Sequence, residues 1–256
     1  MKKFCFTVDD NIRFLKELCE ADAQSLFDHP YTEMLFRLHE KFNLKIQLNL
    51  FYRTEGFDLS EMTDRFANEW RENSGWLKLS FHSDCENVCP YESSDYEEVF
   101  EDCRAVNSEV MRFASSDSLA RTTTVHYCQT TEEGVHAVAD NGVMGLLGLF
   151  GNSENPHTSY SLGEKLAQRI RGGEIVSTDG MAYAAIDAVI NNIEMKNIVP
   201  TLSAFLARDS IRVMIHEQYF YEDYKSYQPD FEEKLARVFS WMRDNGFESC
   251  FFEEII

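Results

Sequence analysis

The sequence predicts an α/β protein with a largely parallel sheet, which helices cover and close into a barrel or a partly open barrel. Strand-like and helix-like segments alternate along the 256 residues, at intervals of roughly thirty to forty residues. Neither a linker nor a low-complexity tract interrupts this alternation, so residues 1–256 are expected to form a single domain. In such folds the loops that follow the carboxyl ends of the strands gather at one face, where sites are built.

Alternating or β-branched residues predict the strands, and most strands end in residues that can carry chemistry. The first strand, 4–8, leads into Asp9 and Asp10. Later strands, each given with the residue at its end, are 45–52 with Tyr52, 76–81 with His82, 121–125 with His126, and 211–215 with His216 and Glu217. An apolar run at 143–150 predicts a further strand, and 181–190 suits either a buried strand or a helix. The residues at the strand ends are therefore the candidate site.

Apolar residues at helical spacing predict the helices that connect these strands. Pro30 suits the first position of a helix, and Gly142 and Gly246 suit helix ends. The expected helices cover 12–20, 30–42, 63–73, 96–114, 132–141, 162–171, 197–206 and 230–245. The stretch 153–177, which contains one of them, is interpreted as an insertion or a covering loop over one face.

The composition limits the partners of this protein. A hydrophobic fraction of 44% and an aromatic fraction of 13% are typical of a folded globular chain. With 24 basic and 44 acidic residues the net charge is −20, which disfavours nucleic acid and anionic membranes. Neutral or cationic ligands stay possible.

The amino terminus and the cysteines indicate a cytoplasmic protein. Residues 1–3 are Met-Lys-Lys, and no apolar run of the kind found in signal peptides follows before Asp9. The seven cysteines are an odd, scattered set, which favours reduced thiols over a disulfide framework.

The spacing of His82 and Glu86 indicates a metal site. They are four residues apart, so one helical turn after the strand at 76–81 would place both on one face. Imidazole and carboxylate ligands suit a borderline divalent ion, above all zinc. Asp10 would be the third ligand and would leave an open position for water, whose pKa a metal lowers from ~15.7 to about 7.

Three short motifs in this sequence resemble a known family. Thr7-Val8-Asp9-Asp10 and His82-Ser83-x-x-Glu86 resemble the first two motifs of the polysaccharide deacetylases, which belong to the carbohydrate esterases. Met214-Ile215-His216 resembles the strand that carries the late histidine of that family. The resemblance implies a distorted (β/α) barrel of about seven strands. It also implies hydrolysis of an N- or O-acetyl group on a sugar with zinc or another divalent transition metal.

The resemblance further implies roles for individual residues. Asp9 would be the general base that takes a proton from the attacking water, and Asp10 and His82 would bind zinc. His216 would be the general acid for the leaving amine or alkoxide. The metal and a backbone N–H near Tyr127 would stabilise the oxyanion.

The expected substrate is an acetylated, uncharged carbohydrate. Four residues at the strand ends are expected to contact it: Tyr52, His126, Tyr127 and Glu217. For His126 three interpretations stay open, namely a further metal ligand, a substrate contact, or packing.

The sequence also departs from the family pattern. Glu86 stands where the family has a histidine or an aspartate, and its charge would weaken the Lewis acidity of the ion. The arginine–proline motif that supports the base is not recognisable within 121–129, and the aspartate–tryptophan motif is absent within 146–152. The alternative is therefore a barrel of the same fold that binds carbohydrate or regulates, and has lost its chemistry.

Two further interpretations have less support. Cys85 and Cys89 with His82 suggest a structural zinc site, but such sites usually need a second ligand pair at short spacing, which the sequence lacks. Phosphatases of the aspartyl-phosphate type have two aspartates separated by one residue, whereas Asp9 and Asp10 are adjacent.

Overall fold

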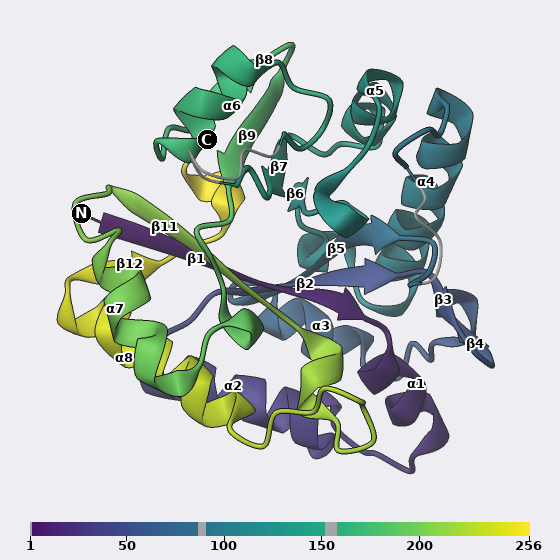
Figure 1. Ribbon diagram of the computed structural model, residues 1–256. Coiled ribbons are helices and arrows are strands. Elements are labelled where there is room, and N and C mark those ends of the chain that lie inside the picture. The colour runs from purple at the N-terminus through teal and green to yellow at the C-terminus, as the bar shows by residue number, and fades with distance from the viewer. Residues whose placement is uncertain (1, 87–90, 152–157) are drawn as a thin grey trace.

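The computed structural model describes residues 2–86, 91–151 and 158–256, and its centre is strand β1 (Lys2–Asn11) (Figure 1). All strands of the central sheet run parallel to β1. Each connection between them returns to the same end of the sheet. The order across this sheet is β10 (Ala188–Val189), β11 (Ser210–His216), β1, β2 (Ile46–Phe51) and β5 (Leu77–Ser83), with β12 (Phe247–Ser249) beside the start of β1.

A second, smaller sheet continues the first one at both of its edges. Its order is β6 (Thr122–Thr123), β7 (Gly145–Gly148), β9 (Met181–Ala185) and the antiparallel β8 (Val176–Thr178). On one side a parallel bridge joins Leu79 of β5 to Leu119, and Ala120 N donates to Leu79 O over 2.8 Å. On the other side β9 runs directly into β10, where Asp187 N donates to Arg212 O of β11 over 2.8 Å. The parallel strands thus follow one another around a distorted barrel, which confirms the predicted fold class.

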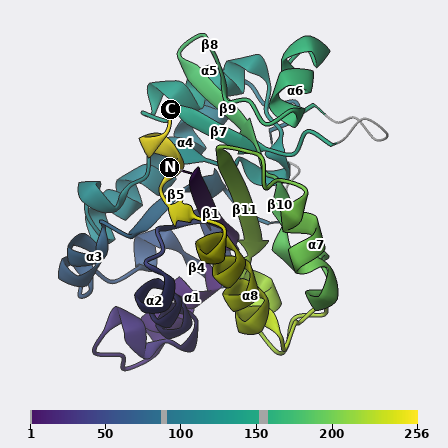
Figure 2. The same ribbon diagram turned by 90° about the vertical axis from the view of Figure 1, so that its left-hand side faces the viewer.

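Amphipathic helices cover the outside of the sheets. Figure 1 shows α2, α7 and α8 on one side of the central sheet, whereas α5 and α6 lie beside the smaller sheet; Figure 2 gives the view from the side. The helices are α1 (Arg13–Glu20), α2 (Pro30–Phe42), α3 (Ala67–Asn73), α4 (Tyr96–Phe113), α5 (Glu132–Asp140), α6 (Glu164–Arg171), α7 (Ile198–Ser203) and α8 (Phe231–Asp244). The longest, α4, begins after Asp95, whose side chain accepts from Glu98 N over 3.0 Å, and it buries Val99 and Val106 against the core.

The observed elements differ from the predicted ones mainly where the strands are short. The strand expected at 121–125 is reduced to β6, and the ambiguous segment 181–190 forms β9 and β10. A small antiparallel hairpin, β3 (Arg53–Thr54) with β4 (Phe57–Asp58), was not predicted. The covering segment at 153–177 contains α6, and its residues 153–157 lie outside the described part of the chain.

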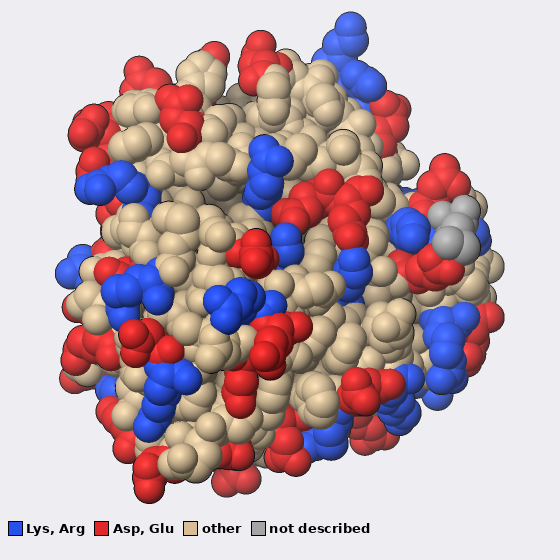
Figure 3. All heavy atoms as spheres, turned by 180° about the vertical axis from the view of Figure 1, so that it is seen from behind, with Lys and Arg blue, Asp and Glu red and all other residues tan. Residues whose placement is uncertain are grey.

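The surface is rich in acidic groups, as the net charge of −20 requires. Figure 3 shows Asp and Glu side chains spread over one face among fewer Lys and Arg side chains. None of the helices in the described ranges combines the length and the apolar composition that a membrane-spanning helix needs.

Candidate metal centre

Asp9 and Asp10 both reach one cavity because the backbone is irregular at the end of β1. Consecutive residues of a regular strand point to opposite faces. Here Asp10 adopts a left-handed conformation with φ 63°, and the β1–β2 register shifts between Val8 and Asn11. The cavity has a volume of about 330 Å³, and its lining includes Asp9, Asp10, His82, His126, Tyr127 and His216. The structure therefore brings together side chains from the ends of β1, β5, β6 and β11.

Asp10, His82 and His126 place three possible ligand atoms close together. His82 Nε2 lies 3.0 Å from Asp10 Oδ1, and His126 Nδ1 lies 3.4 Å from the same oxygen. The two ring nitrogens are 3.1 Å apart. A tetrahedral metal with bonds of about 2.1 Å holds its ligand atoms about 3.4 Å from one another. Within the described ranges, no other set of three His, Cys, Asp or Glu side chains approaches this closely.

The outer nitrogens of both rings are hydrogen-bonded to backbone carbonyls, which fixes where the protons sit. His82 Nδ1 contacts Thr124 O, and His126 Nε2 lies 3.2 Å from Glu86 O. A carbonyl can only accept, so each outer nitrogen carries a proton, and the inner nitrogen of each ring, when it holds no proton, turns a lone pair towards Asp10 Oδ1. Together with Asp10 Oδ1, these lone pairs form a cluster of three acceptors that a cation would stabilise. The donor set therefore fits a divalent metal, and the carbonyls orient its ligands.

The two aspartates have different electrostatic environments. Burial would raise the pKa of Asp10, but contacts with His126 and His82 lower it well below its usual value. Burial raises the pKa of Asp9, although the nearby His82 and His216 oppose the shift. Burial lowers the pKa of His82, but the charge of Asp9 and the contact with Asp10 raise it, and the net shift is upward. Asp10 thus suits a ligand, and Asp9, the more basic carboxylate, suits proton transfer.

Two amide side chains of β2, which were not predicted as site residues, hold Asp9 in place. Asn49 Nδ2 donates to Asp9 Oδ1 over 2.6 Å, and Gln47 Nε2 donates to Asn49 Oδ1 over 2.7 Å. Gln47 Oε1 accepts from Thr122 Oγ1 over 2.9 Å. The sequence signal was present, because amides at alternating positions of an otherwise apolar strand point to the same face.

His216 is paired with Asp9 in the β1–β11 register. Its Nδ1 lies 2.9 Å from Asn191 Oδ1, so this nitrogen donates and Nε2 is the one left to exchange a proton. Tyr127 also has a left-handed backbone, with φ 58°, and its side chain is 57% exposed. Its ring centroid lies 4.1 Å from that of His126. Tyr127 therefore stands where the cavity meets solvent.

Glu86 lies at the edge of the cavity rather than in the ligand cluster. Its side chain is exposed, and the contact it makes with the cluster is the one between its backbone carbonyl and His126. His126 stands with Asp10 and His82 in the position that was expected for Glu86. Of the alternative structural zinc site, Cys85 is described and Cys89 lies outside the described residues.

The carboxylate of Glu217 accepts hydrogen bonds from the first residues of α1. Its carboxylate accepts from Ile12 N and Phe14 N, both over 2.8 Å, and from Tyr221 Oη over 2.6 Å. It thereby satisfies backbone amides at the start of α1. Burial raises its pKa to about 7, although these hydrogen bonds lower it. The carboxylate therefore positions α1, and a substrate contact by Glu217 stays a prediction.

The Tyr52 side chain interacts with Asp58 and Ser60, and its expected contact with the substrate stays a prediction. Burial is the main cause that raises the pKa of Tyr52, and the carboxylate of Asp58 in β4 raises it further. A hydrogen bond with Ser60 opposes the shift. Its side chain thus interacts with the segment that follows the β3–β4 hairpin.

No protein-family model and no curated protein sequence matches this chain. Solved structures do match. A family 4 acetyl xylan esterase from Clostridium thermocellum, in complex with a cobalt ion, has a TM-score of 0.55 at 11% identity, with 99% of this chain and 90% of that chain covered. A polysaccharide deacetylase from Bacillus cereus has a TM-score of 0.52 at 12% identity, with 99% and 94% covered. The fold is that of the polysaccharide deacetylases.

A third match shows that the fold by itself does not decide the chemistry. A 4-alpha-glucanotransferase from Thermococcus litoralis has a TM-score of 0.63 at 12% identity, and covers 99% of this chain and 40% of that one. Identities this low establish the fold alone, so the function of this protein has to be argued from its own site.

Proposed function

We propose that this protein is a metal-dependent hydrolase that removes an N- or O-acetyl group from a neutral carbohydrate. The observation that supports it most is the convergence of three inward lone pairs, on Asp10, His82 and His126, beside Asp9 and His216. Two nitrogens and one carboxylate oxygen suit zinc or a similar divalent ion. The net charge of −20 favours an uncharged substrate over a polyanionic one.

The side chains of the cavity divide the proton transfers between them. A metal held by Asp10, His82 and His126 would supply Lewis acidity and a bound water of lowered pKa. Asp9 Oδ1 is occupied by Asn49, so Oδ2 takes the proton from the attacking water. His216 donates a proton from Nε2 to the leaving nitrogen or oxygen, while Asn191 holds its ring. Tyr127 and the exposed Glu86, at the edge of the cavity, contact the sugar.

Acetate release and metal content, measured together, test this function. Protein loaded with zinc should release acetate from at least one acetylated sugar. Asp9→Asn should retain the metal and lower kcat by about 10²–10⁴-fold, the usual contribution of a general base. Asp117→Asn, at an exposed aspartate after α4, is the matched control. Full activity of Asp9→Asn, or a parent protein that binds no divalent metal, would disprove the function.

A carbohydrate-binding barrel without chemistry is the second candidate. The observation that favours it is the support of Asp9 by the neutral amides Asn49 and Gln47, where the family resemblance implied an arginine. Metal binding together with sugar binding, but no acetate release, would identify this case.

We also propose a cytoplasmic location. Five cysteines in the described ranges are free thiols: Cys5, Cys19, Cys103, Cys128 and Cys250. Free thiols are typical of reducing compartments.

A further inference from the structure

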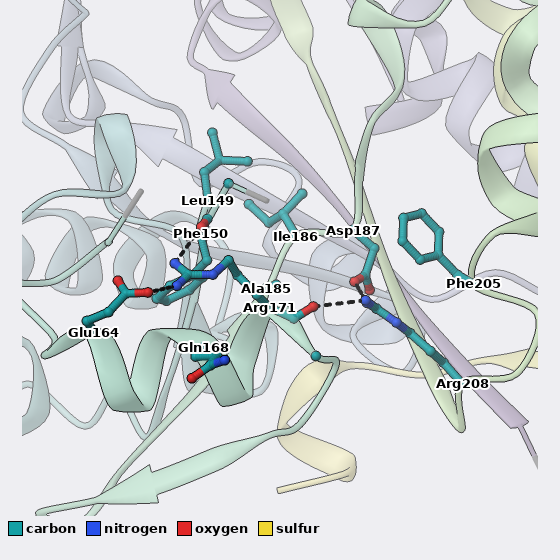
Figure 4. Close-up of a pocket in the computed structure, with 12 residues that line it drawn as sticks. Leu149, Phe150, Glu164, Gln168, Arg171, Ala185, Ile186, Asp187, Phe205 and Arg208 are labelled. Atoms are coloured by element: carbon teal, nitrogen blue, oxygen red, sulfur yellow. Dashed lines mark hydrogen bonds and ion pairs between the residues drawn. The ribbon is translucent and has the colours of Figure 1, made fainter. Parts of the chain in front are cut away.

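Two cavities near α6 differ in how their charged side chains are paired. In a cavity of about 780 Å³, Arg171 forms an ion pair with Glu164, and Arg208 forms one with Asp187 (Figure 4). A smaller cavity, of about 160 Å³, lies between α5, the residues before α6 and the turn from β8 to β9. None of the residues described as lining it also lines the cavity of the metal centre.

Two carboxylates reach the smaller cavity from different elements. Glu132 is the first residue of α5, and Asp179 lies in the turn between β8 and β9. Within the described ranges neither forms an ion pair, and the side chain of Asp179 accepts a hydrogen bond from its neighbour Thr178 Oγ1 over 3.0 Å. Of the described lining residues, only His136 can carry a positive charge. The cavity therefore holds negative charge that the protein leaves without a cation.

A buried phenol faces the same space. Tyr183 in β9 lines the cavity and is 4% exposed, yet its hydroxyl makes no hydrogen bond with the part of the chain that the structure describes. Burial raises the pKa of Tyr183 to about 12, and the charges of Asp179 and Glu132 contribute to the shift, so both carboxylates lie near this hydroxyl. Buried polar groups normally have a partner. A ligand that donates hydrogen bonds would supply one.

The walls of the cavity are aromatic and apolar. The ring centroid of Tyr160 lies 6.2 Å from that of Tyr183, and the Tyr160 hydroxyl is already bonded to Leu147 O, so Tyr160 offers its ring to the cavity. The faces of such rings attract cations. Aliphatic side chains complete the walls: Val135, Leu162, Leu166 and Met181.

We propose that this cavity binds a small primary alkylammonium ion. Its ammonium group has three N–H donors, which match two carboxylates and the phenol oxygen, and its alkyl chain would pack against the apolar walls. Sites for drug-sized ligands usually have about 300–1,000 Å³, so a cavity of about 160 Å³ fits a ligand of a few non-hydrogen atoms. The net charge of −20 attracts cations to the protein. The inference does not depend on the proposed hydrolase function, because different residues line the two cavities.

Titration of the full chain with n-butylammonium chloride, followed by NMR chemical shifts of the backbone amides, tests this. The titration is run at pH 8, above the usual titration range of histidine, so that His136 does not repel the ligand. Saturable shifts should appear at residues 132–139 and 178–183, with a Kd of about 1 mM or lower. n-Butanol has the same chain without the charge, and should bind at least about tenfold more weakly.

Conservative variants separate this site from general attraction to an acidic surface. Glu132→Gln combined with Asp179→Asn should weaken binding about tenfold. Asparagine tolerates the left-handed φ of 51° at position 179, so the turn should be retained. Tyr183→Phe removes one acceptor and should weaken binding by about two- to tenfold. Glu133→Gln, at an exposed position of α5 outside the described lining, is the matched control and should change the Kd by less than about twofold.

Three results would overturn the inference. They are no saturable binding below about 50 mM, equal binding of n-butanol, and a loss in Glu133→Gln as large as in the double variant.

The ammonium group can belong to a free amine or to a lysine side chain, which carries it on a four-carbon chain as n-butylammonium does. Nα-acetyl-lysine methylamide distinguishes the two sources. Tighter binding of this compound than of n-butylammonium would identify a lysine of another protein as the occupant, and weaker binding would identify a free amine.

Discussion

Asp187→Asn should strongly destabilise the protein, because it removes the partner of a buried positive charge. Arg212 in β11 is 1% exposed, and its guanidinium lies 3.0 Å from Asp187 Oδ2. The other hydrogen bonds of the guanidinium are to neutral groups: Nε donates to Ala185 O and Nη1 donates to Ser210 Oγ, each over 2.8 Å. Asparagine keeps the shape of the side chain but not its charge.

The expected cost follows from this burial. Breaking a buried ion pair by removing one partner costs about 3–5 kcal/mol, because the remaining charge cannot reach water. For a chain of this size that loss lowers Tm by about 6–20 °C. Urea unfolding followed by circular dichroism measures the free energy of unfolding directly. Asp209→Asn, at an exposed aspartate directly before β11, is the control and should stay within about 0.5 kcal/mol of the parent.

A second substitution separates lost charge from lost shape. The double variant Asp187→Asn, Arg212→Met also removes the guanidinium that would otherwise be buried without a partner. It should therefore be more stable than Asp187→Asn alone by about 1–2 kcal/mol. An Asp187→Asn variant within 1 kcal/mol of the parent, or a double variant less stable than the single one, would refute this reasoning.

Three further predictions concern the metal centre and α1. His126→Ala should abolish metal binding, whereas Glu86→Ala should retain it; metal analysis distinguishes this from a site in which Glu86 is the third ligand. The pKa of His82 is raised, so protons compete with the metal for this side chain below that pKa. The affinity for the metal, measured by titration, should therefore fall about tenfold for each pH unit below it. An affinity that does not depend on pH would contradict this. Glu217→Ala leaves the amides of α1 without acceptors and should cost about 3 kcal/mol in urea unfolding. The exposed Glu222→Ala is its control, and a Glu217→Ala variant that raises KM at unchanged stability would show a substrate contact instead.

The fold could be predicted because the long elements carry strong local signals. The alternation within β2 and β11, and the apolar spacing in α4 and α8, gave these elements nearly their observed bounds. The hairpin β3–β4 and the short β6 could not be predicted in this way. Strands of two residues contain no full period, and they form only because the tertiary contacts around them are already in place.

The site could be predicted in part, since parallel strands bring their carboxyl ends together. This placed Asp9, Asp10, His82 and His126 in one cavity. The sequence favoured Glu86 as the third member of the cluster, whereas the structure places His126 there, because the outcome depends on backbone geometry after β5 and β6. A spacing of four residues is informative only if a helical turn follows, and at His82 the chain continues as strand to Ser83.

The left-handed backbone at the cavity has a consequence for evolution and engineering. Asp10, Tyr127 and Cys128 all have φ near +60° without being glycine, a conformation that costs of the order of 1 kcal/mol or more at each position. Tyr127→Gly, at the exposed one of these positions, should therefore relieve strain and raise Tm, and a lower Tm for this variant would count against stored strain. Selection for thermal stability alone would favour substitutions at these three positions first. A library selected in this way should therefore be screened for metal binding from its first round.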